Sequence, residues 1–177
     1  MKKYFFAFVF LLFLTACNNE AGKKDTAAAP AEEKPAVELP YKATYSSSWT
    51  QDVSDADLKM VLQTYKDWET GNMAGLAAAF GDSLSWDMAD GSHKMLAHAE
   101  AAKTMGAYRD SISTVRIDMG AWNKMHSTDK KSDVIVTWYD EWDTFKSGKA
   151  DSAAYHDINV VEKGKIVYYA TFKRPKK

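Results

Sequence analysis

The chain has 177 residues, a formal net charge of −1 and one cysteine. This length suits one domain with one core, and the absence of a basic stripe argues against a nucleic-acid partner. A single cysteine excludes a disulfide within the chain and a zinc site built on cysteine. Six tryptophans and nine tyrosines indicate either a generous core or an aromatic-lined cavity.

The N-terminus has the pattern of a targeting segment. Lys2 and Lys3 precede the apolar run YFFAFVFLLFL, which is shorter than the roughly 20 residues of a membrane-spanning helix but typical of a signal peptide. The run ends in LTAC at residues 14–17, which resembles the bacterial lipobox. The resemblance implies a signal peptide and lipobox over residues 1–17 and lipidation of Cys17, with palmitate as an acyl chain, which anchors the chain to the bilayer. The alternative is a cleaved secretory signal with an unrelated cysteine.

Residues 18–40 consist mainly of alanine, lysine, glutamate and proline, with few large apolar side chains. Such a segment cannot bury enough apolar surface to offset its ordering entropy, which predicts a disordered tether. As a partly extended coil it would hold the rest of the chain on the order of 25–40 Å from the bilayer. Asn18 follows the lipobox cysteine, and the enterobacterial sorting rule then favours the outer membrane. The predicted location is therefore the bacterial cell envelope, lipid-anchored at the outer membrane.

Residues 41–177 are predicted to form one domain, which starts with an extended arm. Ser54 is a good helix N-cap, and Asp57 three residues later resembles the second member of a capping box. The helix that follows spaces its apolar side chains to make one buried stripe: Leu58, Val61, Leu62, Tyr65 and Trp68. Gly71 ends this helix, because glycine readily takes the left-handed conformation at a helix C-terminus. A shorter second helix is predicted up to Gly81.

A short strand, a third helix and four long strands are predicted next. The sequence DSLSWDM alternates and indicates a strand, and the third helix is expected over about 94–109. The long strands are expected over about 112–125, 133–145, 152–162 and 165–173. Their connections, HSTDKK, KSGK and EKG, are short enough for antiparallel hairpins.

This order of elements predicts an α+β fold in which helices cover one face of a curved antiparallel sheet. Three segments, YKDWETGNMAGLAAAF, SLSWDMADG and YHDINVVEKGKI, resemble the nuclear transport factor 2-like superfamily, particularly its SnoaL-like branch. The resemblance implies a cone-shaped sheet of four to six strands packed on three N-terminal helices, with a pocket at the wide end. Members include isomerases, dehydratases, polyketide cyclases and binding domains without chemistry, so the fold cannot choose the function.

Candidate catalytic residues follow from the alternation of side chains along the predicted strands. If the more apolar side of each strand is concave, His156 points into the pocket and its neighbour Asp157 points outward. A turn centred on Gly148 then sets Asp140 opposite His156, at the Cβ separation of about 4.5–5.5 Å that permits a hydrogen bond. The predicted Asp140–His156 pair could act in acid–base catalysis, contact a ligand, or simply satisfy two buried polar groups.

Candidate ligand-binding residues are mainly aromatic. Trp138 and Trp142 lie on the same predicted face and could provide flat walls for a ligand, with Trp86 as a third. Tyr168 joins them if residues 162–164 form a three-residue turn, whereas a two-residue turn would break this agreement. Tryptophans at alternating strand positions could equally be core residues.

No metal and no cofactor are predicted. His93 and His98 lie five residues apart, which is not ligand spacing on a helix, and the sequence has no phosphate-binding glycine loop or nucleophile elbow.

Two classes of function remain. The first is a domain that binds a small apolar ligand or a protein, or forms a homodimer through the outer sheet face with Trp122, Tyr139 and Tyr155. The second is a cofactor-free isomerase, dehydratase or cyclase that uses Asp140 and His156. Binding is the prediction, because the carboxylate, tyrosine and acid donor of steroid-isomerase-like sites do not map onto the sequence.

Overall fold

The computed structural model describes residues 37–176, nearly all of which belong to one compact unit, Pro40–Lys177. The signal peptide predicted over residues 1–17 and most of the tether predicted over 18–40 lie outside the described residues. None of the helices between residues 37 and 176 is long and apolar enough to cross a bilayer.

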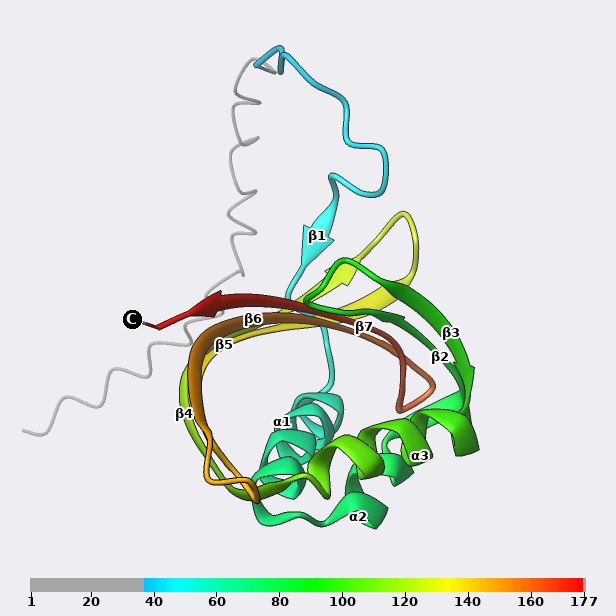
Figure 1. The fold of residues 1–177 in the computed structure, drawn as a ribbon. Coiled ribbons are helices and arrows are strands. Elements are labelled where there is room, and N and C mark those ends of the chain that lie inside the picture. The colour runs from blue at the N-terminus through cyan, green and yellow to red at the C-terminus, as the bar shows by residue number, and fades with distance from the viewer. Residues whose placement is uncertain (1–36, 177) are drawn as a thin grey trace, which may run out of the picture. The chain divides into compact units, whose positions relative to one another are not determined.

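Within residues 37–176 the chain forms three helices: α1 (Asp55–Thr70), α2 (Met73–Ala78) and α3 (His98–Arg109). The same residues form seven strands: β1 (Trp49–Thr50), β2 (Phe80–Asp87), β3 (His93–Ala97), β4 (Ile112–Ser127), β5 (Ser132–Phe145), β6 (Ala150–Glu162) and β7 (Lys165–Pro175). All seven lie in one sheet, in the order β1-β4-β5-β6-β7-β2-β3, which arches over the helices (Figure 1). Neighbours are antiparallel except β2 and β7. The predicted α+β fold is confirmed, with more strands than the four to six predicted.

Helix α1 begins and ends where the sequence predicts. The Ser54 hydroxyl accepts a hydrogen bond from the backbone N–H of Asp57 and donates one to its carboxylate. The first of these satisfies a backbone donor that the first helical turn leaves free. At the other end Gly71 takes the left-handed conformation, with a φ of 76°. Val61 and Tyr65 of the predicted apolar stripe are buried, so α1 covers the sheet with the expected face.

Helix α3 begins later than predicted. The sequence indicates a helix from about residue 94, but His93–Ala97 form strand β3 and pair with β2. This pairing sets Leu96 directly opposite Leu84, and both side chains are buried. The cross-strand contact explains why a segment of helical composition takes a strand conformation.

The hairpin between β5 and β6 has a different register from the predicted one. Its loop spans residues 145–149, so the centre of the turn lies one residue earlier than expected. Asp140 consequently lies opposite Ala154, and His156 lies opposite Trp138. The predicted pairing of Asp140 with His156 is therefore wrong.

The hairpin between β6 and β7 has the shorter of the two turns considered. Glu162 pairs with Lys165, and the two residues between them, Lys163 and Gly164, both have positive φ. Turns of this kind match the twist of the strands that they join. A β-bulge follows at the start of β7, and it leaves Tyr168 on the outer face of the sheet. The predicted three-residue turn is wrong.

On β5 and β6 the concave face of the sheet carries the opposite set of side chains from the predicted one, whereas on β4 the predicted Ile117 and Met119 do pack against the core. On β5 this face presents Ile135, Thr137, Tyr139 and Glu141, all of which are buried beneath the helices. Trp138 lies on the outer face and is 41% exposed. The prediction took the more apolar set of each strand as concave. It is wrong on β5 and β6, where Thr137, Tyr139, Asp157 and Asn159 are buried through hydrogen bonds within one cluster.

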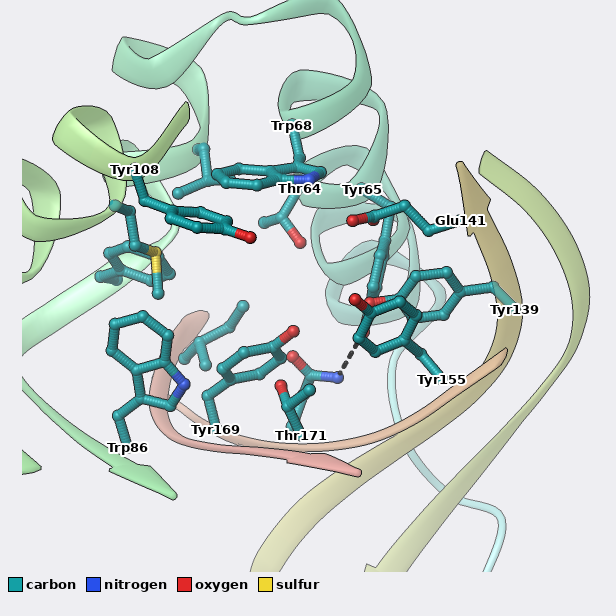
Figure 2. A pocket seen from close by; sticks show the side chains of 15 residues that line it. Thr64, Tyr65, Trp68, Trp86, Tyr108, Tyr139, Glu141, Tyr155, Tyr169 and Thr171 are labelled. Atoms are coloured by element: carbon teal, nitrogen blue, oxygen red, sulfur yellow. Dashed lines mark hydrogen bonds between the residues drawn. The ribbon is translucent and has the colours of Figure 1, made fainter. Parts of the chain in front are cut away.

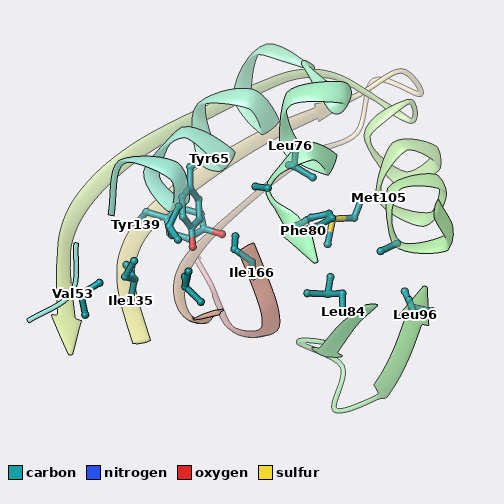
Figure 3. Packing of buried hydrophobic residues seen from close by; sticks show 14 residues of the cluster. Val53, Tyr65, Leu76, Phe80, Leu84, Leu96, Met105, Ile135, Tyr139 and Ile166 are labelled. Atoms are coloured by element: carbon teal, nitrogen blue, oxygen red, sulfur yellow. The ribbon is translucent and has the colours of Figure 1, made fainter. Parts of the chain in front are cut away.

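The core lies between this face and the helices (Figure 3). Its buried side chains come from the segment before α1, from all three helices and from five strands: Val53, Val61, Tyr65, Leu76, Ala79, Phe80, Leu84, Leu96, Ala101, Met105, Ile135, Tyr139, Val161 and Ile166. Several of them, including Tyr65, Phe80 and Tyr139, also line a cavity. The core and the candidate site are therefore continuous.

Candidate functional site

A cavity of about 160 Å³ lies between the helices and the concave face of the sheet. Fifteen residues line it: Thr64, Tyr65, Trp68, Leu76, Phe80, Trp86, Met105, Tyr108, Tyr139, Glu141, Tyr155, Asn159, Ile166, Tyr169 and Thr171. Figure 2 shows aromatic side chains around the space, from the helices on one side and the strands on the other. Because a protein cavity of about 150 Å³ can admit benzene, this one has room for a molecule about the size of one aromatic ring.

The periodicity of each element brings these side chains to one place. Thr64 and Trp68 are four residues apart on α1 and so project from the same side of the helix. Tyr139 and Glu141 are two residues apart on β5 and so point to the same face of the sheet. The same alternation on β6 and β7 supplies the floor of the cavity.

Contacts between aromatic rings fix the walls of the cavity in the absence of a ligand. Trp68 stacks on Tyr108 with ring centroids 6.0 Å apart and planes 10° from parallel. Tyr139 stacks on Tyr155 with centroids 5.1 Å apart and planes at 11°. Aromatic pairs contribute about 0.5–1.5 kcal/mol beyond the area that they bury. The walls are thus largely preformed.

Arg109 fixes the helical side of the cavity. Its guanidinium donates hydrogen bonds to the backbone carbonyls of Trp68, Glu69 and Ile112, at 2.8, 3.2 and 3.0 Å. These carbonyls belong to the last turn of α1 and the first residue of β4. One side chain at the end of α3 therefore ties three elements together, and its guanidinium also lies 6.0 Å from the ring centroid of Trp68.

A fully buried carboxylate lies behind the floor of the cavity. Oδ2 of Asp157 accepts hydrogen bonds from the hydroxyls of Tyr169, Tyr139 and Tyr65, at 2.7, 2.9 and 3.0 Å. Burial raises the pKa of Asp157 to about 6, and the three hydroxyl donors offset part of that rise. Burial also raises the pKa of each tyrosine well above its usual range, so all three remain donors.

The hydrogen positions around Tyr65 follow from counting donors. Its single hydroxyl hydrogen goes to Asp157, so the Thr137 hydroxyl 2.7 Å away donates to Tyr65. The side-chain amide of Asn159 donates to Tyr65 and to the Ile135 carbonyl. Both amide hydrogens of Asn159 are therefore used, and its side-chain oxygen remains as an acceptor.

A second acidic group reaches the cavity itself. Glu141 lines the cavity, and Asp143 follows it on the same face of β5. Burial raises the pKa of Glu141 to about 8, and repulsion from Asp143 adds to the rise. Burial raises the pKa of Asp143 as well. Because two neighbouring carboxylates repel each other, the pair holds one proton near neutral pH.

Three buried side-chain atoms between residues 37 and 176 lack a hydrogen-bond partner: Trp86 Nε1, Asp143 Oδ1 and Asp157 Oδ1. Such atoms are rare in folded proteins, and each costs free energy while it stays unpaired. The indole nitrogen of Trp86 faces the cavity in Figure 2. A ligand in the cavity could therefore supply the missing acceptor for that donor.

Of the predicted site residues, the structure places Trp86 in the cavity and the others outside it. Trp138 and His156 stack on the outer face, with ring centroids 5.0 Å apart and planes at 8°. Tyr168 donates a hydrogen bond to Asp87, and its place in the lining is taken by the next residue, Tyr169.

The remaining two predicted residues also lie on the outer face, where both have charged partners. Lys176 forms a salt bridge with Asp140. The Arg116 guanidinium lies 3.5 Å from the ring centroid of Trp142. The structure therefore does not bring Asp140 and His156 to the cavity, and a role for either in its chemistry loses its geometric basis.

The predicted dimer patch does not lie on the outer face. Tyr139 and Tyr155 line the cavity, and Trp122, which is 51% exposed, lies opposite Thr137 of the concave face. On the outer face, Trp138, His156 and Phe172 contact one another in a row across β5, β6 and β7.

Sequence reasoning missed most of the cavity, including Asp157, Glu141 and Tyr169. A signal was present: on β5 and β6 the alternate positions hold Thr137, Tyr139 and Glu141, then Tyr155, Asp157 and Asn159. Tyrosine, threonine, asparagine and carboxyl side chains at adjacent strand positions can satisfy one another when buried. No group of three His, Cys, Asp or Glu residues within 37–176 is arranged to hold a metal ion.

Comparison with known proteins bears on the N-terminus and the fold. Residues 1–18 match the family model for prokaryotic membrane lipoprotein lipid attachment sites, which makes the chain a lipid-anchored protein of the bacterial cell envelope. No curated protein sequence matches the chain.

Several solved structures share the fold of the described unit. An NTF2-like protein of unknown function from Burkholderia pseudomallei has a TM-score of 0.55 at 16% identity, over 68% of this chain and 92% of its own. An LEH-like epoxide hydrolase from M. tuberculosis has 0.57 at 10%, over 67% and 83%. A putative polyketide cyclase from Pseudomonas putida has 0.51 at 14%, over 67% and 91%. The chain therefore has an NTF2-like fold, and identities this low show the fold alone.

Proposed function

We propose that this lipid-anchored NTF2-like domain binds a small, largely apolar ligand in its aromatic cavity, without chemistry. The observation that carries the proposal is a cavity of about 160 Å³ whose walls are mostly aromatic or aliphatic and are held in place by their own contacts. Cavities that bind small molecules are typically apolar and preformed, with few polar groups that orient the ligand.

The proposal extends to the location of the domain. Asn18, directly after the lipidated Cys17, favours retention at the outer membrane, and acylation with palmitate would supply the anchor. A tether over residues 18–40 would let the domain meet ligands at some distance from the bilayer. Quantitative lipoprotein fractionation of wild type and Asn18→Asp tests this: the variant is expected to shift toward the inner membrane, and an unchanged distribution contradicts the outer-membrane proposal.

Tryptophan resonances provide the test of ligand binding. Two of the six tryptophans, Trp68 and Trp86, line the cavity, and the other four do not. The unit Pro40–Lys177 contains the whole described core and can be prepared without the lipid. Toluene added to this unit should shift the indole N–H signals of Trp68 and Trp86 in NMR spectra while the other four stay in place. Uniform shifts, or none, would contradict the proposal.

A cavity-filling variant sharpens this experiment. Thr64→Leu adds apolar volume at a buried lining position of α1 and should weaken toluene binding by roughly tenfold, which corresponds to about 1.4 kcal/mol. Trp138→Phe on the outer face is the matched control and should leave toluene binding unchanged. Equal effects of the two variants would place the bound toluene outside the cavity.

One observation favours a second candidate, an enzyme that works by proton transfer without a cofactor. Glu141 reaches the cavity with a pKa raised to about 8, and a general acid is most effective when its pKa is near the working pH. This candidate uses Glu141 in place of the Asp140–His156 pair. It predicts that Glu141→Gln abolishes turnover of a substrate yet leaves toluene binding intact.

A further inference from the structure

Several of the polar atoms that line the cavity can only accept a hydrogen bond from a ligand. Tyr139 and Tyr169 use their hydroxyl hydrogens on Asp157, so a ligand meets only the lone pairs of these oxygens. Asn159 likewise uses both amide hydrogens and retains its carbonyl oxygen. The Thr64 hydroxyl donates to the Val61 carbonyl and is committed as well. At Tyr139, Tyr169 and Asn159 a ligand that offers hydrogen-bond donors therefore fits better than one that offers acceptors.

The charge of the residues that line the cavity also favours a ligand that donates hydrogen bonds. The fifteen lining residues include one acidic residue, Glu141, and no lysine, arginine or histidine. The two cations that act on Asp143 have other partners: Lys173 binds Asp151 at 2.7 Å, and Arg109 donates to three backbone carbonyls. No basic side chain of the lining is thus available to neutralise Glu141.

The aromatic walls are suited to a cation. Figure 2 shows the Glu141 carboxyl group beside Trp68 and near Tyr155, with Tyr108 and Trp86 across the cavity. The faces of aromatic rings attract positive charge, and the attraction reaches about 2 kcal/mol when the cation is desolvated. An aromatic enclosure beside one carboxyl group binds a cation by both contacts at once.

We propose that the ligand is a small organic cation, a protonated amine on one ring or a short apolar chain, whose ammonium group meets Glu141 while its apolar part lies among the aromatic side chains. This inference rests on the proposed binding function and names the chemical class of the ligand. The donor of Trp86, on another wall, would meet an acceptor or ring face at the ligand's other end.

The protonation of Glu141 links this binding to pH. The charged groups around Glu141 are Asp143 on β5, Asp157 and Asp151 on β6, Lys173 on β7 and Arg109 on α3. An ammonium group at Glu141 favours its ionised form, so binding should release a proton from the carboxyl pair. Affinity should therefore rise from about pH 6 to pH 8 and fall again where the amine loses its own proton.

Matched probes test the proposal on the unit Pro40–Lys177. Benzylamine is the cation and benzyl alcohol its neutral counterpart of nearly equal shape; binding is measured by calorimetry at pH 8 and followed by the Trp68 and Trp86 indole signals. We expect benzylammonium to bind at least roughly tenfold more tightly, as a charge-assisted hydrogen bond implies. Calorimetry in buffers of different ionisation enthalpy should show the proton release.

Two variants one residue apart provide the control. Glu141→Gln keeps the shape of the side chain and should reduce the preference for benzylammonium over benzyl alcohol to about twofold or less. Asp140→Asn removes a carboxylate on the opposite face of the same strand and should leave the preference unchanged. Cooperative urea unfolding of each variant shows that it is folded.

The outcomes separate this inference from the function on which it rests. If benzyl alcohol binds as tightly as benzylammonium, with shifts at Trp68 and Trp86, the cavity binds ligands but the organic-cation proposal is overturned. If benzylammonium is preferred equally in wild type and Glu141→Gln, the assigned carboxyl group is wrong. If neither these probes nor toluene shift the two indole signals, binding in this cavity fails as a function and the inference fails with it.

Discussion

The two faces of strand β5 differ in a way that their composition does not suggest. The face directed at the helices carries Thr137, Tyr139 and Glu141 and is almost fully buried, whereas the face directed away carries Trp138 and Trp142. Thr137 and Tyr139 are buried here because they belong to the hydrogen-bonded cluster around Asp157. The comparison shows that the more apolar side of a strand need not be the side that forms a cavity.

The largest effect should come from removing the shared acceptor. Asp157→Ala leaves the hydroxyls of Tyr65, Tyr139 and Tyr169 without their partner in a dry interior. Each unsatisfied buried group costs about 1–3 kcal/mol, so we expect a loss of roughly 3 kcal/mol or more in the free energy of unfolding. Urea unfolding measures it, with His156→Ala on the outer face as control. Similar losses for both would mean that the tyrosine–Asp157 cluster is not a stabilising unit.

A pH titration of stability should show the next largest effect. The folded-state pKa values of Asp157 and Glu141, about 6 and about 8, lie above the ordinary values of these groups. Between the ordinary pKa and the folded-state pKa of each group, the native state therefore binds more protons than the unfolded chain. Stability should therefore be highest near pH 4–5 and fall as the pH rises toward 8. The Glu141→Gln variant should lose less stability between pH 6 and pH 8 than the wild type. A stability that rises from pH 5 to pH 8 would contradict the raised pKa values of these two buried carboxyl groups.

Neighbouring residues on β5 allow a smaller, direct comparison. Tyr139→Phe removes one hydroxyl donor from Asp157 and should cost about 1–1.5 kcal/mol in urea unfolding. Trp138→Phe trims a partly exposed ring on the other face and should cost less than about 0.5 kcal/mol. If Trp138→Phe cost more stability than Tyr139→Phe, Trp138 would be the inward-facing residue, and the orientation of β5 predicted from the sequence would be correct.

The smallest effect concerns the outer face alone. Trp138 and His156 stack with centroids 5.0 Å apart, and His156 also lies 5.6 Å from Phe172. A double-mutant cycle between Trp138 and His156 should give a coupling of about 0.5 kcal/mol. A coupling of zero would show that the register of β5 and β6 differs from the one described.

Local signals predicted local structure well. Ser54, Asp57 and Gly71 set the ends of α1, because capping depends only on residues adjacent in sequence. The order of the three helices and of strands β2, β4, β5, β6 and β7, and with it the α+β fold, followed from periodicity and short connections, whereas β1 and β3 were not predicted. The lipobox was equally local and matches a family model.

The site was harder to predict, because it depends on which face of each strand points inward. One residue in the loop over 145–149 separates the predicted pairing of Asp140 and His156 from the observed one. One bulge in β7 exchanges Tyr168 for Tyr169 in the lining of the cavity. Neither feature leaves a strong sequence signal. Of the predicted aromatic walls, only Trp86 lines the cavity within the described residues, since its strand was placed by a simple alternation.

The most direct test of the account is the position of a bound ligand. We would soak crystals of the unit Pro40–Lys177 with 4-bromobenzylamine and locate the bromine by anomalous scattering. The account predicts a bromine peak within the cavity, between Trp68, Trp86 and Tyr108, with the amine directed at Glu141. A peak on the outer face beside Trp138 would contradict it, and would show that the exposed aromatic side chains form the binding surface.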